Sequence, residues 1–190
     1  MNTAPPQNFR VIIIGAGPGG LCTAIKLREA GIEDFVILEK AAGVGGTWWH
    51  NRYPGAECDV KSHLYSFSFE LKTDWSRPFA GQAEILTYLQ HVAHTYGLHP
   101  YVRFGHTVRA AHWQVETTDG QLFRAPVVIS GLPNLFMLYG PNTNNGLIIS
   151  MLEIQVDYIL RQIKRLARER LAFIDLRPDA QVFEAHRAPV

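Results

Sequence analysis

Three glycines near the start of the chain have the spacing of a phosphate-binding turn. Gly15, Gly17 and Gly20 form a GxGxxG pattern directly after an apolar run. In such a turn the first glycine permits a tight bend, the second lets the backbone approach a pyrophosphate, and the third allows a helix to pack closely on a strand. The helix that follows offers unpaired N–H groups to the phosphates. The pattern therefore predicts a dinucleotide site.

A carboxylate stands where a ribose contact is expected. Glu39 ends a second apolar stretch, 19 residues after Gly20. A carboxylate at this place accepts hydrogen bonds from ribose hydroxyls and repels a 2′-phosphate. We therefore expect an adenine dinucleotide other than NADP at this first site. FAD and NAD both use this motif, so the motif alone leaves the choice between them open.

Residues 43–69 match neither the helical nor the strand period and are rich in glycine and aromatic residues. Loops of this length are usually functional. Gly43, Gly45 and Gly46 form a second glycine cluster, which a long flavin dinucleotide would need as it crosses the sheet. The aromatic residues of this segment either wall a planar ring system or only cover the sheet, and the residues leave both interpretations open. They are Trp48, Trp49, Tyr53 and Tyr65.

The elements around these residues predict an α/β fold. A strand at residues 11–14, a helix at 21–30 and a strand at 35–40 form a βαβ unit. We expect a three-layer, Rossmann-like domain with a central parallel sheet, in which the first strand is buried on both faces. Further expected elements are helices at 82–96 and 147–170, strands at 102–104 and 134–140, and a β-meander over 107–130 with a hairpin at Asp119-Gly120.

Composition excludes several classes of protein. The chain has 190 residues, 47% of them hydrophobic, which suits one domain over residues 9–190 after a disordered segment at 1–8. A net charge of +1 gives no electrostatic basis for binding nucleic acid or an anionic membrane. Two cysteines, no apolar leader and no run long enough to span a bilayer predict a cytoplasmic protein.

Other candidate chemistry lacks the necessary spacing. His91, His94 and His99 are not accompanied by HExxH or CxxC patterns, so we expect no metal site. No GxSxG motif supports a hydrolase. Cys58 has no CxxC partner and is expected to be a packed cysteine rather than a reactive thiol.

Two longer stretches resemble a known family. GGTWWHNRYPGAECDVKSHLYSFSFE at residues 45–70 and PNLFMLYGPNT at 133–143 are similar to class B flavoprotein monooxygenases, especially Baeyer–Villiger monooxygenases and flavin-containing monooxygenases. The resemblance covers nearly the whole chain and implies non-covalently bound FAD. It places Asp59 and Val60 beside the isoalloxazine ring, with Asp59 as the candidate for a catalytic influence. Val108 would meet the adenine, and the turn after Tyr139 would face the pyrimidine edge of the flavin. The full set of cofactor-binding residues implied in this way is Gly15, Gly17, Pro18, Gly20, Glu39, Lys40, Gly46, Thr47, Trp48, Asp59, Val60, Tyr65 and Val108.

The chain also departs from this family. Its members are several hundred residues long and carry a second GxGxxG in an inserted NADPH domain, whereas this chain has one such motif. The FxGxxxHxxxWP fingerprint is absent, and no residue matches the family's arginine near the flavin. Gly131 and Leu132 correspond to the residues that flank the inserted domain, so we expect that insertion to be missing at about 131–132.

These observations favour an isolated FAD-binding domain of monooxygenase origin, and they leave open whether it is an enzyme. One alternative is a small active flavin oxidase or reductase, or a peroxide-driven oxygenase, with an external electron donor. Another is an NAD-binding module without flavin. Because removal of a covering domain exposes apolar surface, a homodimer is a further expectation.

Overall fold

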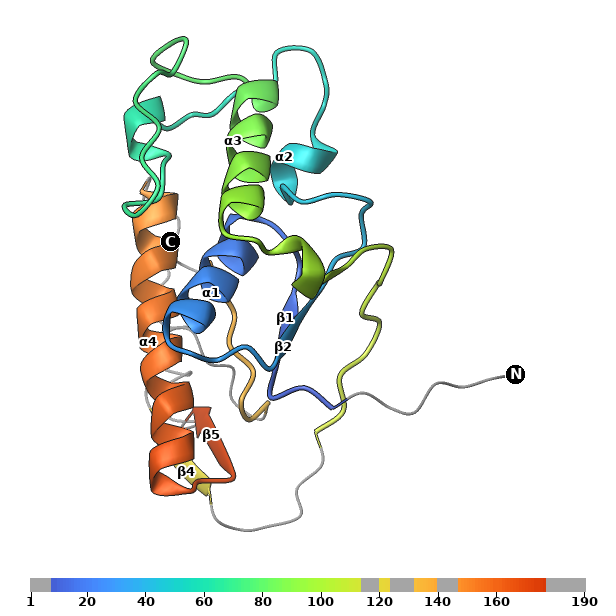
Figure 1. Cartoon of the computed structure of the whole chain (residues 1–190), viewed down its shortest axis with the longest axis vertical. Coiled ribbons are helices and arrows are strands. Elements are labelled where there is room, and N and C mark those ends of the chain that lie inside the picture. Colours follow the sequence, from blue (N-terminus) through green and yellow to red (C-terminus); the bar gives the residue numbers. More distant parts are fainter. Residues whose placement is uncertain (1–7, 114–119, 124–131, 140–146, 177–190) are drawn as a thin grey trace, which may run out of the picture. The chain divides into compact units, whose positions relative to one another are not determined.

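The chain divides into two compact units (Figure 1). Met1–Ser62 and Lys72–Arg109 form the first, and His63–Leu71 and Ala110–Val190 form the second. The computed structural model describes residues 8–113, 120–123, 132–139 and 147–176.

The first unit contains a parallel sheet in the order β1-β2-β3. β1 (Val11–Ile14) pairs with β2 (Phe35–Leu38), and β2 pairs with β3 (Val102–Arg103). α1 (Pro18–Glu29) connects β1 to β2 and packs on both strands. The predicted βαβ unit is therefore present, and the Rossmann-like arrangement of a parallel sheet with helices is confirmed.

Gly20 sets the distance between α1 and β1. A Cβ on Gly20 would lie 2.0 Å from the carbonyl oxygen of Gly15 and 3.4 Å from Cγ2 of Ile13. Only a residue without a side chain permits this approach. It lets α1 bury Leu21, Ala24 and Ile25.

The burial of β1 differs from the prediction. Ile13 is 7% exposed, whereas Ile12 and Ile14 are 57% and 58% exposed. Successive strand residues point to opposite faces of a sheet, and α1 packs on one face only. The expectation that this strand is buried on both faces is therefore wrong.

Two further helices of the first unit pack together. α3 (Gln82–Thr95) buries Ile85, Leu89 and Val92 and contacts both α1 and the short α2 (Thr47–His50). Gly97, with φ of +59°, follows the end of α3 as expected for a glycine that ends a helix. A 3-10 turn, η2 (His99–Tyr101), follows in this unit, and another, η1 (Ser62–Leu64), begins at the last residue of one of its segments, Ser62.

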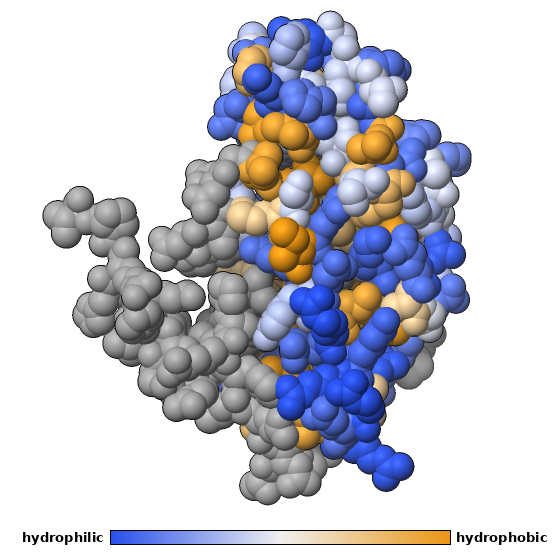
Figure 2. All heavy atoms as spheres, turned by 90° about the vertical axis from the view of Figure 1, so that its left-hand side faces the viewer, coloured by the Kyte–Doolittle hydropathy of each residue, from blue (hydrophilic) through white to orange (hydrophobic). Residues whose placement is uncertain are grey.

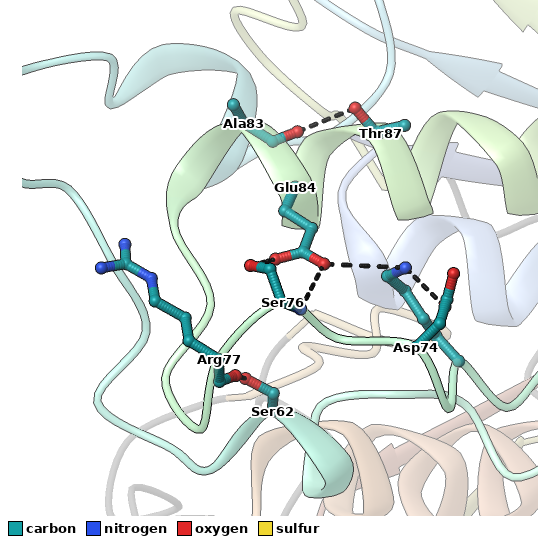
Figure 3. A network of polar contacts seen from close by, with 8 residues as sticks. Ser62, Asp74, Ser76, Arg77, Ala83, Glu84 and Thr87 are labelled. Atoms are coloured by element: carbon teal, nitrogen blue, oxygen red, sulfur yellow. Dashed lines mark hydrogen bonds and ion pairs between the residues drawn. The ribbon is translucent and has the colours of Figure 1, made fainter.

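A carboxylate in the first turn of α3 holds the segment that precedes the helix (Figure 3). Oε1 of Glu84 accepts the backbone N–H of Ser76 at 3.0 Å, and Oε2 accepts the Ser76 hydroxyl at 2.7 Å. Nζ of Lys72 lies 3.7 Å from Glu84 and 2.7 Å from Asp74. These contacts fix residues 72–77 against the helix N-terminus, where negative charge is favoured.

The second unit is built around α4 (Ile148–Glu169), followed by β5 (Phe173–Leu176), which pairs in parallel with β4 (Gly120–Phe123). One face of α4 buries Ile149, Leu152, Val156 and Ile159, at the helical spacing that the sequence shows. Ile159 packs against a set of partly buried residues from α4 and from residues 132–139, namely Phe136, Leu138, Tyr158 and Ile163.

Of the strand predicted at 134–140, the described residues 134–139 form turns around a single bridge residue, Phe136, and residue 140 lies outside the described residues. Asn134 has φ of +59° and Tyr139 has φ of +54°, which a strand does not allow. Asn134 exchanges two hydrogen bonds of 2.8 Å with Ile174, one through its backbone N–H and one through Oδ1. The side chain thus replaces the main-chain pairing that a strand would have provided.

The β-meander expected over 107–130 lies largely outside the described residues, as does Asp119 of its hairpin. β4, the strand that the structure describes in this range, pairs in parallel with β5. Neighbouring strands of a β-meander are antiparallel, so the parallel pairing of β4 with β5 is not a meander pairing.

The surface of α4 becomes more hydrophilic toward its C-terminal end. Arg161, Lys164 and Arg168 are exposed there, and Figure 2 shows hydrophilic residues gathered at the lower end of the face that it presents. Glu169 pairs with Arg165 at 2.8 Å and with Arg168 at 2.9 Å. None of the helices in the described ranges has the length and apolar character needed to cross a bilayer.

We expect Glu84→Gln to lower stability at neutral pH but not in acid. The hydrogen bonds from Ser76, together with the charge of Lys72, lower the pKa of Glu84 below its ordinary value. A carboxylate with a lowered folded-state pKa stabilises the protein above its unfolded-state pKa, and the stabilisation disappears as pH falls through the folded-state pKa. The loss at pH 7 should be about 0.5–1 kcal/mol, since Glu84 is only partly buried and solvent screens its charge.

Urea unfolding at pH 7 and at about pH 3 measures this difference. Glu29→Gln is the control, because Glu29 makes one exposed ion pair with Lys26 on α1. An equal effect of Glu84→Gln at both pH values would contradict the prediction.

Candidate dinucleotide site

The glycine turn between β1 and α1 presents backbone N–H groups at a helix N-terminus. Gly15 has φ of +94° and donates its N–H to the carbonyl of Leu38 at 2.9 Å. Gly17 is the N-cap of α1 and Pro18 its first residue. Intrahelical bonding begins with the N–H of Leu21, which reaches the Gly17 carbonyl at 3.0 Å. The N–H groups of Gly17, Gly19 and Gly20 precede that bond and suit an anion.

Glu39 lies beside this turn and is 3% exposed. Its Oε2 accepts the N–H of Ala16 at 2.6 Å, and its Oε1 accepts the N–H of Ala41 at 2.7 Å. A carboxylate has about four lone-pair positions, so acceptor capacity remains for ribose hydroxyls. The two amide donors also compensate for the burial of the charge.

The backbone of Glu39 joins the turn to the third strand. Its N–H donates to the carbonyl of Arg103 at 3.0 Å, and its carbonyl accepts the N–H of His106 at 2.9 Å. Gly105 donates its N–H to the carbonyl of Ala41 at 3.1 Å. The carboxyl ends of β2 and β3 are therefore held together at the place where open α/β sheets bind ligands.

The second glycine cluster lies directly against the first. A Cβ on Gly46 would be 2.7 Å from Cα of Gly17, and a Cβ on Gly17 would be 3.3 Å from Cα of Gly46. Gly45 donates its N–H to the carbonyl of Ala16 at 2.9 Å. The two glycine segments are thus in backbone-to-backbone contact.

The two tryptophans of this region have protein partners. Trp48 is buried, and its carbonyl accepts a hydrogen bond from Nε2 of Gln82. Trp49 occupies the space above Gly43 and lies 4.5 Å from the guanidinium of Arg52. Tyr53 is exposed. Both tryptophans therefore pack within their own region of the first unit.

Asp59 and Val60 lie on a segment that runs beside residues 78–81. Cys58 donates its N–H to Ala80 at 3.0 Å, and Ser62 donates its N–H to Pro78 at 2.7 Å. Asp59 is exposed and Val60 half-buried. Burial raises the pKa of the Cys58 thiol, with a further contribution from the negative charge of Asp59, although the N–H of Val60 donates to Sγ at 3.4 Å. Cys58 is therefore a protonated, packed cysteine, in agreement with the prediction.

The first unit contains most of the predicted cofactor residues but not all of them. Tyr65 is buried in the second unit, which also holds Tyr139, and the polar turn after Tyr139 lies outside the described residues. Val108 is half-buried near the end of the first unit, whereas Lys40 and Thr47 are exposed. Nowhere in the described ranges do three or more metal-binding side chains gather.

The residue types did not reveal the backbone contacts that hold this site. Ala16, Gly45 and His106 fix the turn and Glu39 with main-chain groups. Side-chain chemistry does not reveal such contacts. For Gly45, membership of the second glycine cluster was the available signal.

Comparison with known proteins agrees with this geometry. Residues 13–81 match the family model for an NAD(P)-binding Rossmann-like domain. A Baeyer–Villiger monooxygenase of Streptomyces coelicolor is 50% identical over 131 residues, covering 65% of this chain and 25% of that protein. The FAD-binding monooxygenase ktnD of Aspergillus niger is 52% identical over 104 residues, covering 54% of this chain and 17% of that protein.

A solved structure is also similar. The structure described as an OTEMO complex with FAD and NADP is 37% identical, with a TM-score of 0.51, and the match covers 55% of this chain and 20% of that one. This chain spans a quarter or less of the length of the two curated relatives.

We expect Glu39→Ala to destabilise the ligand-free protein. Two buried N–H groups would lose their acceptor, at a cost of about 1–3 kcal/mol each. Glu39→Gln keeps one acceptor oxygen and should lose less. Urea unfolding without ligand measures the difference, with Glu33→Ala as the control because Glu33 is exposed. Equal stability of Glu39→Ala and Glu33→Ala would mean that the carboxylate does not hold the turn.

Proposed function

We propose that this chain, which over part of its length is a homologue of Baeyer–Villiger monooxygenases, binds FAD non-covalently. In this proposal residues 9–190 form one FAD-binding domain of monooxygenase origin, and the NADPH-binding insertion is missing at about 131–132. Gly131 of that junction lies outside the described residues.

One observation carries the proposal: a buried carboxylate lies beside the N-terminus of α1. Glu39 is held against the glycine turn by the 2.6 Å hydrogen bond from Ala16. The free N–H groups of Gly17, Gly19 and Gly20 fit a pyrophosphate, and the remaining lone pairs of Glu39 fit a ribose diol. The residues present therefore suit the adenosine diphosphate half of FAD.

The flavin half rests on the relatives. Proteins named Baeyer–Villiger or FAD-binding monooxygenases match more than half of the chain. When bound, FAD would supply the redox chemistry. We propose that Asp59 and Val60 lie beside its ring and that Val108 meets the adenine. Lys40, Gly46, Thr47, Trp48 and Tyr65 complete the proposed set. Asp59, which is exposed, would act on the ring through its charge.

Electrons would come from an external donor, because the chain carries one dinucleotide motif and FAD would occupy it. The chain spans only part of the length of its relatives, and we propose that the whole protein is an oxidoreductase. We also propose that it is located in the cytoplasm and that it forms a homodimer.

Reconstitution tests the cofactor. The purified protein is titrated with FAD, FMN and NAD, and binding is followed by flavin fluorescence and calorimetry. We expect FAD to bind and to remain after gel filtration, and FMN to bind far more weakly because it lacks the adenosine and one of the two phosphates. Binding of NAD without any flavin would favour the second candidate, an NAD-binding module, which the description of the matched domain supports.

Glu39→Ala should weaken FAD binding, because the ribose hydroxyls lose a charged acceptor worth about 1.5–3 kcal/mol. Glu33→Ala is again the control. Equal FAD affinities of the two variants would show that Glu39 does not contact the ribose.

We expect NADPH to reduce the FAD-loaded protein very slowly. After chemical reduction and exposure to oxygen, hydrogen peroxide should be the main product, because a pocket that excludes water and directs oxygen to a substrate requires more groups than Asp59 and Arg52 provide. Anaerobic stopped-flow absorbance with NADPH and product analysis with a ketone measure both expectations. Rapid reduction, or nearly stoichiometric ester formation, would instead favour an active enzyme.

A further inference from the structure

We propose that Gly45 and Gly46 position the phosphate-binding turn, in addition to any contact of Gly46 with the cofactor. The inference deepens the proposed function and rests on it, since it concerns the same dinucleotide site. It assigns these two glycines a role exerted through Ala16 and Gly17.

The first support is the contact between two backbones. A Cβ on Gly46 would lie 2.7 Å from Cα of Gly17 and 3.4 Å from its nitrogen. Real Cβ atoms essentially never come this close to another heavy atom, and both neighbours are main chain, which cannot rotate away. A side chain at residue 46 would therefore displace Gly17, the N-cap of α1.

The second support is the hydrogen bonding of Ala16. Its N–H donates to Oε2 of Glu39 at 2.6 Å, and its carbonyl accepts the N–H of Gly45 at 2.9 Å. Ala16 is fully buried. The peptide groups on both sides of Ala16 are thus hydrogen-bonded within the protein, one to Glu39 and the other to Gly45. These bonds orient the N–H groups that follow toward a ligand.

The third support is that Gly45 and Gly46 are themselves held firmly. Their carbonyls accept the N–H groups of Trp48 and Trp49, both at 3.1 Å, at the start of α2. Cδ1 of Leu86 on α3 lies 2.4 Å from the position of a Cβ on Gly45. The glycine pair therefore lies between the phosphate-binding turn and α3 and holds that turn in one conformation.

The test compares ADP with FAD in the Gly46→Ala variant. ADP carries the adenosine and two phosphates but no isoalloxazine ring. If Gly46 positions the turn, the affinity for ADP should fall together with that for FAD, by about tenfold or more. If Gly46 acts on the flavin alone, FAD binding should weaken while ADP binding stays at the wild-type value, and the proposal is wrong.

Gly55→Ala is the matched control. Gly55 also has a positive φ, +83°, but no atom lies within 4 Å of the position of its Cβ. Gly55→Ala therefore imposes backbone strain without a contact to the phosphate-binding turn. The affinities for ADP and for FAD should both stay within about twofold of wild type. Equal losses in Gly46→Ala and Gly55→Ala would overturn the proposal.

If Gly46→Ala does not fold, hydrogen exchange of the Gly45 N–H in the wild-type protein tests the same role. This N–H donates to the carbonyl of Ala16 at 2.9 Å, so it should be protected in the ligand-free protein and more strongly protected when ADP binds. Rapid exchange that FAD slows and ADP does not would overturn the proposal. Failure of the proposed function is distinguishable, because a wild-type protein that binds ADP but not FAD still permits the ADP comparison.

Discussion

The buried carboxylate of Glu39 is the interaction on which the first unit depends. Removing a charge from water is costly unless hydrogen bonds replace the water. Here the replacements are main-chain N–H groups of Ala16 and Ala41, while the backbone of Glu39 continues the pairing toward β3. One residue therefore joins the glycine turn, the end of β2 and the loop after β3. The same arrangement leaves lone pairs at the edge of the sheet where a ribose would lie.

The second constraint on the first unit is that two positions must be occupied by glycine. Gly20 lets α1 approach β1, and Gly46 lets a distant loop approach Gly17. In both cases backbone meets backbone, so the geometry cannot adjust by a change of rotamer. Close packing of this kind makes the turn rigid before any ligand arrives, which lowers the ordering cost of binding.

The sequence was most informative where structure is local. Apolar periodicity and the glycine spacing predicted β1, α1, β2, α3 and α4, because each depends on residues within one or two turns. It was wrong at residues 134–140, where apolar residues suggested a strand but Asn134 adopts a left-handed conformation and bonds Ile174, 40 residues away. The parallel pairing of β4 with β5 is equally non-local. The same holds for the site. Glu39 and the glycines of the GxGxxG pattern were recognisable in the sequence, whereas the contacts of Ala16 and Gly45 are visible only in the folded chain.

The one-sided burial of β1 has a consequence for self-association. In the described part of the chain, no strand pairs with the outer edge of β1, and Ile12 and Ile14 face outward. Natural edge strands are usually guarded by lysine, proline or a bulge against the addition of another strand. Residues 11–14 are Val-Ile-Ile-Ile and carry none of these guards, and Arg10 is the neighbouring charge. Within the described residues β1 therefore ends the sheet with an unguarded edge, and the tendency of the protein to aggregate depends on what covers that edge.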